Sequence, residues 1–230
     1  MTLSSVKWVA AICVYWGVAG CTSQPPAAQW ALEAQSASDR AVQAYLKGQV
    51  RVAEVEWGKA LNEVSATGKP AAMARLALLQ CASQIAALEL TACPRYQRYA
   101  AGAAPAEQAY ARYLQAEHVA ADVALLPAAQ QSVAAQLLVQ KPVAALPQAE
   151  ALSQLTAAGV ALRSGLAQRA VVQHAAEVAS AQGWRRAAMA WWLLEQRLAQ
   201  EAGDEAAAQA ASLHLQVFEE SQSAKDAIKK

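Results

Sequence analysis

Histidine, cysteine and carboxylate side chains are the usual carriers of metal and acid–base chemistry, and in this 230-residue chain they are widely spaced. His118, His174 and His214 have no second His and no Cys three or four residues away, which is the spacing that a zinc site on a helix needs. Glu177 follows His174 by three residues, so we expect a surface or groove pair on one helical face. The sequence has no Gly-rich phosphate loop and no Gly-x-Ser-x-Gly motif. We therefore predict no catalytic residues, no metal site and no cofactor.

The densest aromatic cluster, Trp184, Trp191 and Trp192, lies beside Arg185 and Arg186. Trp184 and Trp191 are seven residues apart and share one helical face, whereas Trp192 lies about 100° further round the helix. Both faces can be buried only if the helix lies between neighbouring helices. Two interpretations stay open. Either all three indoles pack in the interior, or one is exposed with Arg185 beside it, where Trp and Arg make good anchors for a partner.

A second region is rich in tyrosine and arginine. One interpretation is a solvated edge with amphipathic rings. The other is a partner-binding surface in which Tyr96 and Tyr99 take part. The residues of this region are Arg95, Tyr96, Arg98, Tyr99, Tyr110, Arg112 and Tyr113.

The first twenty residues have the parts of a secretory signal. Lys7 provides positive charge near the amino terminus, residues 8–17 are an apolar run, and small residues follow. As a helix, such a run would reach about 15 Å, roughly half the ~30 Å of a bilayer core. A spanning helix is therefore disfavoured relative to a cleaved signal.

The signal closes on the motif Val18-Ala-Gly-Cys21, which resembles the lipobox of bacterial lipoproteins, with Val18 where Leu is commoner. The resemblance implies removal of residues 1–20 and three acyl chains on Cys21. One chain binds membranes only marginally, so several give stable anchoring. The two residues after Cys21 are not acidic, which in this family implies the outer membrane and its periplasmic face. Residues 21–28 then form a short tether. Plain secretion and a retained helix are the alternatives.

Cys81 and Cys93 would then lie in a compartment that oxidises thiols. A disulfide between them would add ~3 kcal/mol by the chain-entropy estimate. A continuous helix would hold the two Cα atoms about 18 Å apart, whereas a disulfide needs ~7 Å or less. Either the helix ends early and residues 91–94 fold back to form the bridge, or both thiols stay free and buried.

Composition predicts the fold class. The chain has 19 basic and 18 acidic side chains, and Lys7 is the only charged one before Cys21, so the remainder is neutral. A neutral chain without long charge runs argues against nucleic acid as a partner. Alanine dominates, followed by other strong helix formers, and strand-like alternation is nearly absent. We predict one all-α domain over residues 29–222 and a frayed C-terminus at 223–230.

Prolines and glycines divide this domain into roughly nine or ten helices. We expect Gly or Pro to stand at nearly every boundary. The predicted helices cover 30–47, 50–66, 71–90, 105–126, 127–141, 147–163, 166–181, 184–202 and 205–222, with a short helical turn within 94–102.

Two turns share one spacing pattern. Gly48, Ala53, Trp57 and Ala60 are five, four and three residues apart, and Gly183, Ala188, Trp192 and Glu195 repeat these intervals. The pattern resembles the tetratricopeptide repeat (TPR), in which a glycine ends the first helix of a hairpin, a small residue lets the helices approach and an aromatic fills the groove. The resemblance implies stacked antiparallel helical hairpins, a TPR-like α-solenoid. Residues 94–150 depart from the pattern, and an irregular helical bundle is the alternative.

Together these features predict a non-enzymatic outer-membrane lipoprotein, attached through lipid on Cys21, that acts as a pilotin-like scaffold or assembly factor for another envelope protein. A small-molecule or lipid-binding lipoprotein that uses the Trp cluster is one alternative. A peptidoglycan-active enzyme is another, because some lipoproteins of that class carry Ala-rich superhelices. That class also needs a catalytic Glu in a separate globular domain, whereas every Glu here lies within the predicted helical repeats.

Overall fold

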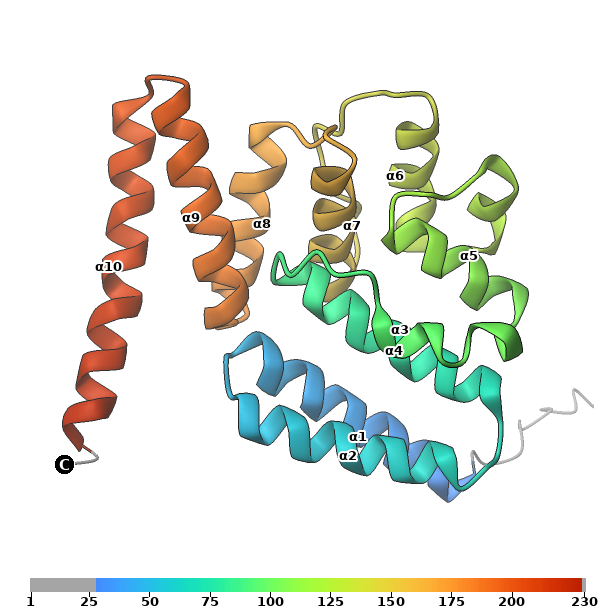
Figure 1. Cartoon of the computed structure of the whole chain (residues 1–230). Coiled ribbons are helices and arrows are strands. Elements are labelled where there is room, and N and C mark those ends of the chain that lie inside the picture. The colour runs from blue at the N-terminus through green and yellow to red at the C-terminus, as the bar shows by residue number, and fades with distance from the viewer. Residues whose placement is uncertain (1–27, 229–230) are drawn as a thin grey trace, which may run out of the picture.

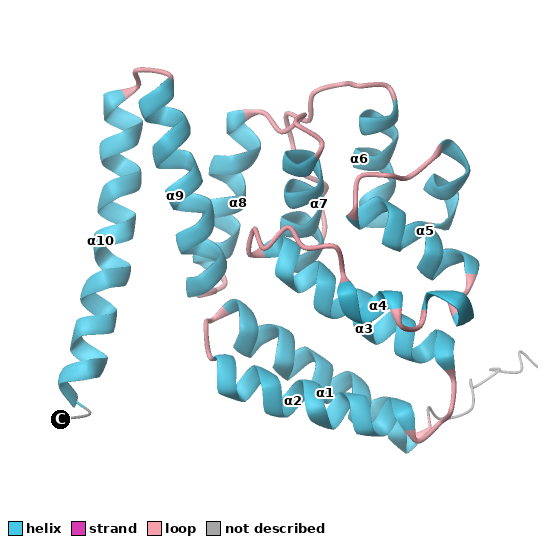
Figure 2. Cartoon of the chain, in the orientation of Figure 1, coloured by secondary structure: helices cyan, strands magenta, loops and turns pink. Residues whose placement is uncertain are grey.

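The structure, a computed structural model, describes residues 28–228 and the side chains as far as Glu220. Every regular element in this range is helical, apart from an isolated bridge between Val143 and Ala167, so the all-α prediction is confirmed (Figures 1 and 2). The helices are α1 (Gln29–Leu46), α2 (Val50–Ser65), α3 (Pro70–Ala86), α4 (Pro94–Gln97), η1 (Ala100–Gly102), α5 (Pro105–Leu114), η2 (Ala120–Leu125), α6 (Ala128–Leu138), α7 (Ala151–Arg163), α8 (Arg169–Ala181), α9 (Arg185–Glu201) and α10 (Glu205–Ile228), where η marks a 3₁₀ helix.

The predictions for the signal, for Cys21 and for nearly all of the tether lie outside the described residues. None of the described helices is both long and apolar enough to cross a membrane. At the other end, α10 stays helical to Ile228, whereas the sequence predicted fraying from residue 223.

Glycine ends α1 and α8, as the shared spacing predicts. Gly48 and Gly183 have φ of +80° and +63°, a left-handed conformation that costs a residue with a Cβ about 1–2 kcal/mol. The chain then folds back on the helix end, because Gln49 N donates to Ala44 O at 2.8 Å and the equivalent bond after Gly183 is 3.0 Å. These turns start α2 beside α1 and α9 beside α8.

Several helices in the middle of the chain are shorter than predicted, and they end at left-handed residues other than glycine. Leu88, Ala116 and Gln140 have φ of 60°, 59° and 54° at the ends of α3, α5 and α6. The predicted helix 71–90 therefore ends at residue 86, the predicted helix 105–126 divides into α5 and η2, and the predicted helix 127–141 shortens to α6. A left-handed residue other than glycine leaves no mark in the sequence.

Two helices also begin later than predicted. α7 begins at residue 151 rather than 147, and α8 begins at residue 169 rather than 166. Between them, Val143 N donates to Leu166 O at 2.8 Å and Gln168 N donates to Val143 O at 3.0 Å. These backbone groups find partners across two loops, so the loops need no helical hydrogen bonds.

Helix α3 is the centre of the fold. It contacts α1 and α2 as well as α5 and α7, and residues on all its faces are buried. The crossing with α7 is close, because a Cβ at Gly159 would lie 2.5 Å from Cγ2 and 2.8 Å from the carbonyl oxygen of Ile85. The buried residues of α3 are Met73, Ala74, Leu76, Ala77, Leu78, Cys81, Ala82, Ser83, Ile85 and Ala86.

The C-terminal helices stand side by side in chain order, α7 against α8, α8 against α9 and α9 against α10, while α1 and α2 form a hairpin of their own (Figure 1). Two indoles connect these parts. Trp184 Nε1 donates to Gln43 Oε1 in α1 at 2.8 Å, and Trp191 Nε1 donates to Ala86 O at the end of α3 at 2.9 Å. The hairpins at the two ends of the chain therefore share one core.

Candidate functional site

The three tryptophans predicted as core residues or as partner anchors are all core residues. Trp184, Trp191 and Trp192 are 3%, 0% and 5% exposed. Trp192 stacks on the ring of His214 at 4.0 Å and donates from Nε1 to Ser180 Oγ at 2.9 Å. The interpretation with one exposed indole is wrong for these residues, because α9 lies between α8 and α10 with further contacts to α1.

The two arginines beside them also serve the fold. Arg185 Nη2 donates to Phe218 O in α10 at 3.0 Å. Arg186 pairs with Glu89 at 2.8 Å, and its guanidinium lies 4.4 Å from the centre of the Tyr45 ring. Burial raises the pKa of the Tyr45 phenol, which therefore stays neutral over the physiological range. Arg185 and Arg186 thus tie α9 to other helices.

The tyrosine- and arginine-rich region has two parts, one at α4 and the residues that follow it, and one in α5. Tyr96 is buried, Tyr99 is half-buried, and Tyr96 borders a polar cavity of about 430 Å³ together with Arg112, Gln115 and Glu117. Arg112 is engaged with Asp122, which accepts its Nε–H at 2.9 Å. Tyr96 is therefore near a cavity, as a partner-binding residue would be, but most of its ring is packed.

The histidines stay far apart and bind different groups. His118 Nε2 lies 2.9 Å from Ala134 O in the interior, and His174 lies 3.3 Å from Gln154 Oε1 and 4.0 Å from Glu177 at the surface. Within the described residues, no group of three His, Cys, Asp or Glu side chains is arranged to hold a metal ion.

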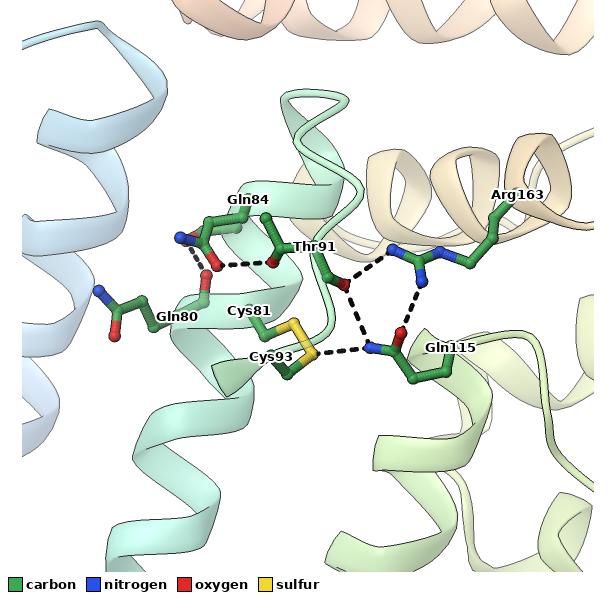
Figure 3. Close-up of a disulfide and its surroundings, with 8 residues drawn as sticks. Gln80, Cys81, Gln84, Thr91, Cys93, Gln115 and Arg163 are labelled. Atoms are coloured by element: carbon green, nitrogen blue, oxygen red, sulfur yellow. Dashed lines mark hydrogen bonds between the residues drawn. A yellow bond between two sulfur atoms is a disulfide. The ribbon is translucent and has the colours of Figure 1, made fainter. Parts of the chain in front are cut away.

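Cys81 and Cys93 are joined in a disulfide with their Cα atoms 5.3 Å apart (Figure 3). The geometry is met because α3 ends at residue 86 and the chain returns along it. Cys93 itself is left-handed, with φ of 49°. Both cysteines are almost fully buried, at 2% and 3% exposure.

Polar side chains from two other helices secure this return (Figure 3). Gln115 Nε2 donates to Cys93 Sγ at 3.1 Å and lies 3.3 Å from Thr91 O. Arg163 donates to the same Thr91 oxygen at 2.9 Å and to Gln115 Oε1 at 2.6 Å. The loop after α3 is therefore fixed to α5 and α7 as well as to α3.

An apolar cavity of about 540 Å³ lies between α3, α5, η2 and α7. Its floor is closed by buried groups, and its rim includes Leu125, which is 44% exposed, and the exposed Ala106. The Thr156 hydroxyl on the floor donates to Leu152 O at 2.8 Å, so it offers no free donor. We call this the apolar cavity. Its lining is Arg75, Leu78, Leu79, Ala82, Ala106, Glu107, Tyr110, Leu125, Leu126, Pro127, Leu152, Ser153 and Thr156.

A second cavity of about 410 Å³ adjoins the first between α1, α3 and the start of α7. Leu79 and Leu152 belong to the walls of both cavities, and both side chains are half-buried. Asp39 and Glu150 line the second cavity and are exposed. We call it the acidic cavity, and the two cavities together the α3–α7 groove.

The linings of the groove set its chemistry. Their titratable side chains are the carboxylates of Asp39, Glu107 and Glu150, the Arg75 guanidinium and the Tyr110 phenol. Burial raises the pKa of Tyr110, so its phenol stays neutral in the apolar cavity. The groove therefore combines an apolar recess with carboxylates at one end.

Sequence reasoning missed this groove. Its walls come from residues up to 145 positions apart, from Asp39 to Trp184, and no local spacing connects them. Helix α3 has apolar residues on every face, a pattern typical of a central helix that does not show which leucines border a cavity. Half-buried Leu79 looks like any other core leucine in the sequence.

Comparison of the chain with known protein families and with curated proteins, and of its structure with solved structures, finds no match.

Proposed function

We propose that this chain is a lipoprotein of the bacterial outer membrane that binds another envelope protein, without catalysis, as a pilotin-like scaffold or assembly factor. The observation that carries the binding part is the apolar cavity. It presents Leu79, Leu152 and Tyr110 around a buried floor, which is the kind of recess that accepts apolar anchors of a partner.

The anchoring part of the proposal rests on sequence. The motif that ends at Cys21 follows a short apolar run, and the first described helix begins at residue 29. Only a few residues therefore separate the proposed lipid from the helical domain, which holds the domain and its groove close to the membrane surface.

The arrangement that we propose for the fold is a TPR-like stack with an irregular centre. The α1–α2 and α8–α9 pairs support it, since Gly48 and Gly183 end the first helix of each pair. Ala53 and Ala188 are buried where the helices approach, at 3% and 0% exposure. Trp57 and Trp192, at the repeat's aromatic position, are both buried at 5% exposure.

Lipid attachment is tested by radiolabelled palmitate. We expect wild-type chain expressed in a Gram-negative host to incorporate label and Cys21→Ser to incorporate none. Globomycin, which blocks the lipoprotein signal peptidase, should cause a longer precursor to accumulate. An unlabelled wild-type chain whose processing is unchanged by globomycin would contradict the anchoring.

Docking in the groove is tested by site-directed photo-cross-linking in the full chain. A photoreactive residue at Leu125, on the rim of the apolar cavity, is compared with one at Leu193 on α9, which is similarly exposed. We expect one defined envelope protein to cross-link at position 125 and not at 193. The same pattern at both positions, or none, would contradict docking in the groove.

A small apolar molecule is a second candidate ligand, because about 540 Å³ falls within the ~300–1,000 Å³ typical of small-molecule sites. We expect mass spectrometry of an organic extract to find a ligand that co-purifies with wild type and is lost from Ala106→Trp, which fills the rim. Equal extracts from both proteins would reject this candidate.

A further inference from the structure

The charges along the α3–α7 groove are not balanced. Asp39 and Glu150 both line the acidic cavity, and within the described residues neither carboxylate has a hydrogen-bond or ion-pair partner. As far as the described residues define it, that lining includes no basic residue. Arg40 follows Asp39 in the sequence, but it is bound to Glu56 at 2.7 Å and to Ser36 at 2.6 Å.

The charges of the apolar cavity, in contrast, neutralise each other. Arg75 donates from Nε and Nη2 to Glu107 Oε1 at 2.9 Å and 2.7 Å. The Glu107 side chain is only 7% exposed beneath the arginine. The groove is therefore apolar and neutral at its α5 end and negative at its α1 end, with Leu79 and Leu152 forming the shared wall between the two.

We propose that the docking segment of the partner is a basic and apolar polypeptide segment. At least one large apolar side chain fills the apolar cavity, and a Lys or Arg close to it in sequence faces Asp39 and Glu150. This inference rests on the proposed function, since it names the chemistry of the partner that docks in the groove. An acidic segment would meet repulsion at the α1 end, so the carboxylates select the partner as well as attract it.

The size of the charge effect follows from exposure. Asp39 and Glu150 are both exposed, so their pairs with a cation are screened by water and salt. We expect removal of both carboxylates to weaken binding of a basic segment by about five- to tenfold at low salt. Removal of the large apolar side chain from the partner segment should weaken binding more, because water would then occupy the apolar cavity in its place.

Selection from a phage library of random dodecapeptides tests this inference. The target is the full chain in nanodiscs of phosphatidylcholine, and empty nanodiscs remove membrane-binding peptides. Four proteins are used in parallel. They are wild type, Asp39→Asn with Glu150→Gln, Ala106→Trp at the rim, and a matched charge control, Glu54→Gln with Glu220→Gln, two exposed carboxylates outside both linings.

We expect wild type and the Glu54/Glu220 control to enrich peptides that combine large apolar residues with Lys or Arg. The Asp39/Glu150 variant should still enrich apolar residues but should lose the excess of Lys and Arg. Peptides with no basic excess on wild type, or a basic excess that survives in the Asp39/Glu150 variant, would overturn this inference and leave groove binding intact. If wild type enriches no peptides other than those that the Ala106→Trp variant also enriches, the proposed docking function would be overturned instead. Circular dichroism of each variant checks that it is folded.

Discussion

The glycine-ended hairpins and the middle of the chain solve the same problem, that of ending a helix and reversing direction, in different ways. In the hairpins, Gly48 and Gly183 adopt the left-handed conformation at little cost, and packing of the paired helices does the rest. From residue 87 to 140, left-handed residues with side chains follow the helix ends, at Leu88, Ala116 and Gln140. Cys93, also left-handed, precedes α4, and its disulfide and the bonds of Arg163 hold the loop after α3.

The difference shows where stability comes from in each region. The stability of the hairpins comes from their local turns and from buried alanines and indoles, so it is the sum of many small contributions. The middle depends on a few long-range connections, above all the disulfide and the bonds of Arg163 to Thr91 and Gln115. The groove lies between the two regions, with α1 on one side and α5 on the other, so the proposed binding requires both to be intact.

The largest effect is expected at Trp191, which joins the regions. Trp191→Ala should lower the free energy of unfolding by about 4 kcal/mol, because it empties a fully buried site and removes the donor to Ala86 O. Urea unfolding followed by circular dichroism measures it. Leu193→Ala, two residues away and half exposed, is the control and should change stability little. Equal losses from the two variants would show that Trp191 does not connect the regions.

Removal of the disulfide should affect the middle region and leave the α8–α9 hairpin unchanged. Cys81→Ala with Cys93→Ala should cost about 3 kcal/mol, the usual value for a loop of this size. Hydrogen exchange should rise in residues 87–93 and stay unchanged in the α8–α9 hairpin. Reducing agent should destabilise wild type by the same amount and leave the double variant unaffected. Faster exchange throughout both regions would mean that they are not separable.

The glycine closure of a hairpin is tested at Gly183. Gly183→Ala should cost about 1–2 kcal/mol, because φ of +63° strains a residue with a Cβ even though nothing lies within 4 Å of that Cβ. Gly58 in α2 also has open space around its Cβ and has no positive φ, so Gly58→Ala is the matched control and should be neutral or slightly stabilising. Thermal unfolding compares the two variants.

One ion pair in the middle region should make stability depend on acid. Hydrogen bonds from Arg112 lower the pKa of Asp122 from 3.8 to about 2, against the opposing effect of burial. Because the pKa is lower in the folded chain, the carboxylate stabilises the fold above about pH 4, and this is lost as the pH falls towards 2.

Arg112→Met should therefore cost about 1 kcal/mol at pH 7, a modest value because the arginine is 41% exposed and solvent screens the pair. The difference between variant and wild type should shrink towards zero near pH 2. Urea unfolding at both pH values measures it, and a difference that does not depend on pH would assign the loss to packing of the arginine stem.

The smallest effect has the opposite sign. Gln140→Gly should stabilise the chain by about 0.5–1 kcal/mol, because glycine relieves the left-handed strain at φ of 54° and the exposed glutamine contributes only a long 3.4 Å contact to Leu137 O. Thermal unfolding measures it. A loss of stability would show that the left-handed conformation of Gln140 does not destabilise the chain.

The sequence predicted the parts of the fold that follow from local chemistry. The all-α class, the α1–α2 and α8–α9 turns and the start of α5 at Pro105 follow from residue type and spacing. The ends of α3, α5 and α6 could not be predicted in this way, since Leu88, Ala116 and Gln140 adopt left-handed turns that their residue types do not indicate. The same holds for the indole cluster, whose burial depends on helices far away in the chain.

The two indole hydrogen bonds carry a consequence for biosynthesis. Trp184 and Trp191 are 141 and 105 residues beyond their acceptors at Gln43 and Ala86. The amino-terminal hairpin therefore lacks both donors until the last third of the chain has joined it, in whichever compartment the chain folds. A nonsense codon before position 184 would leave α1 and α3 permanently without these contacts.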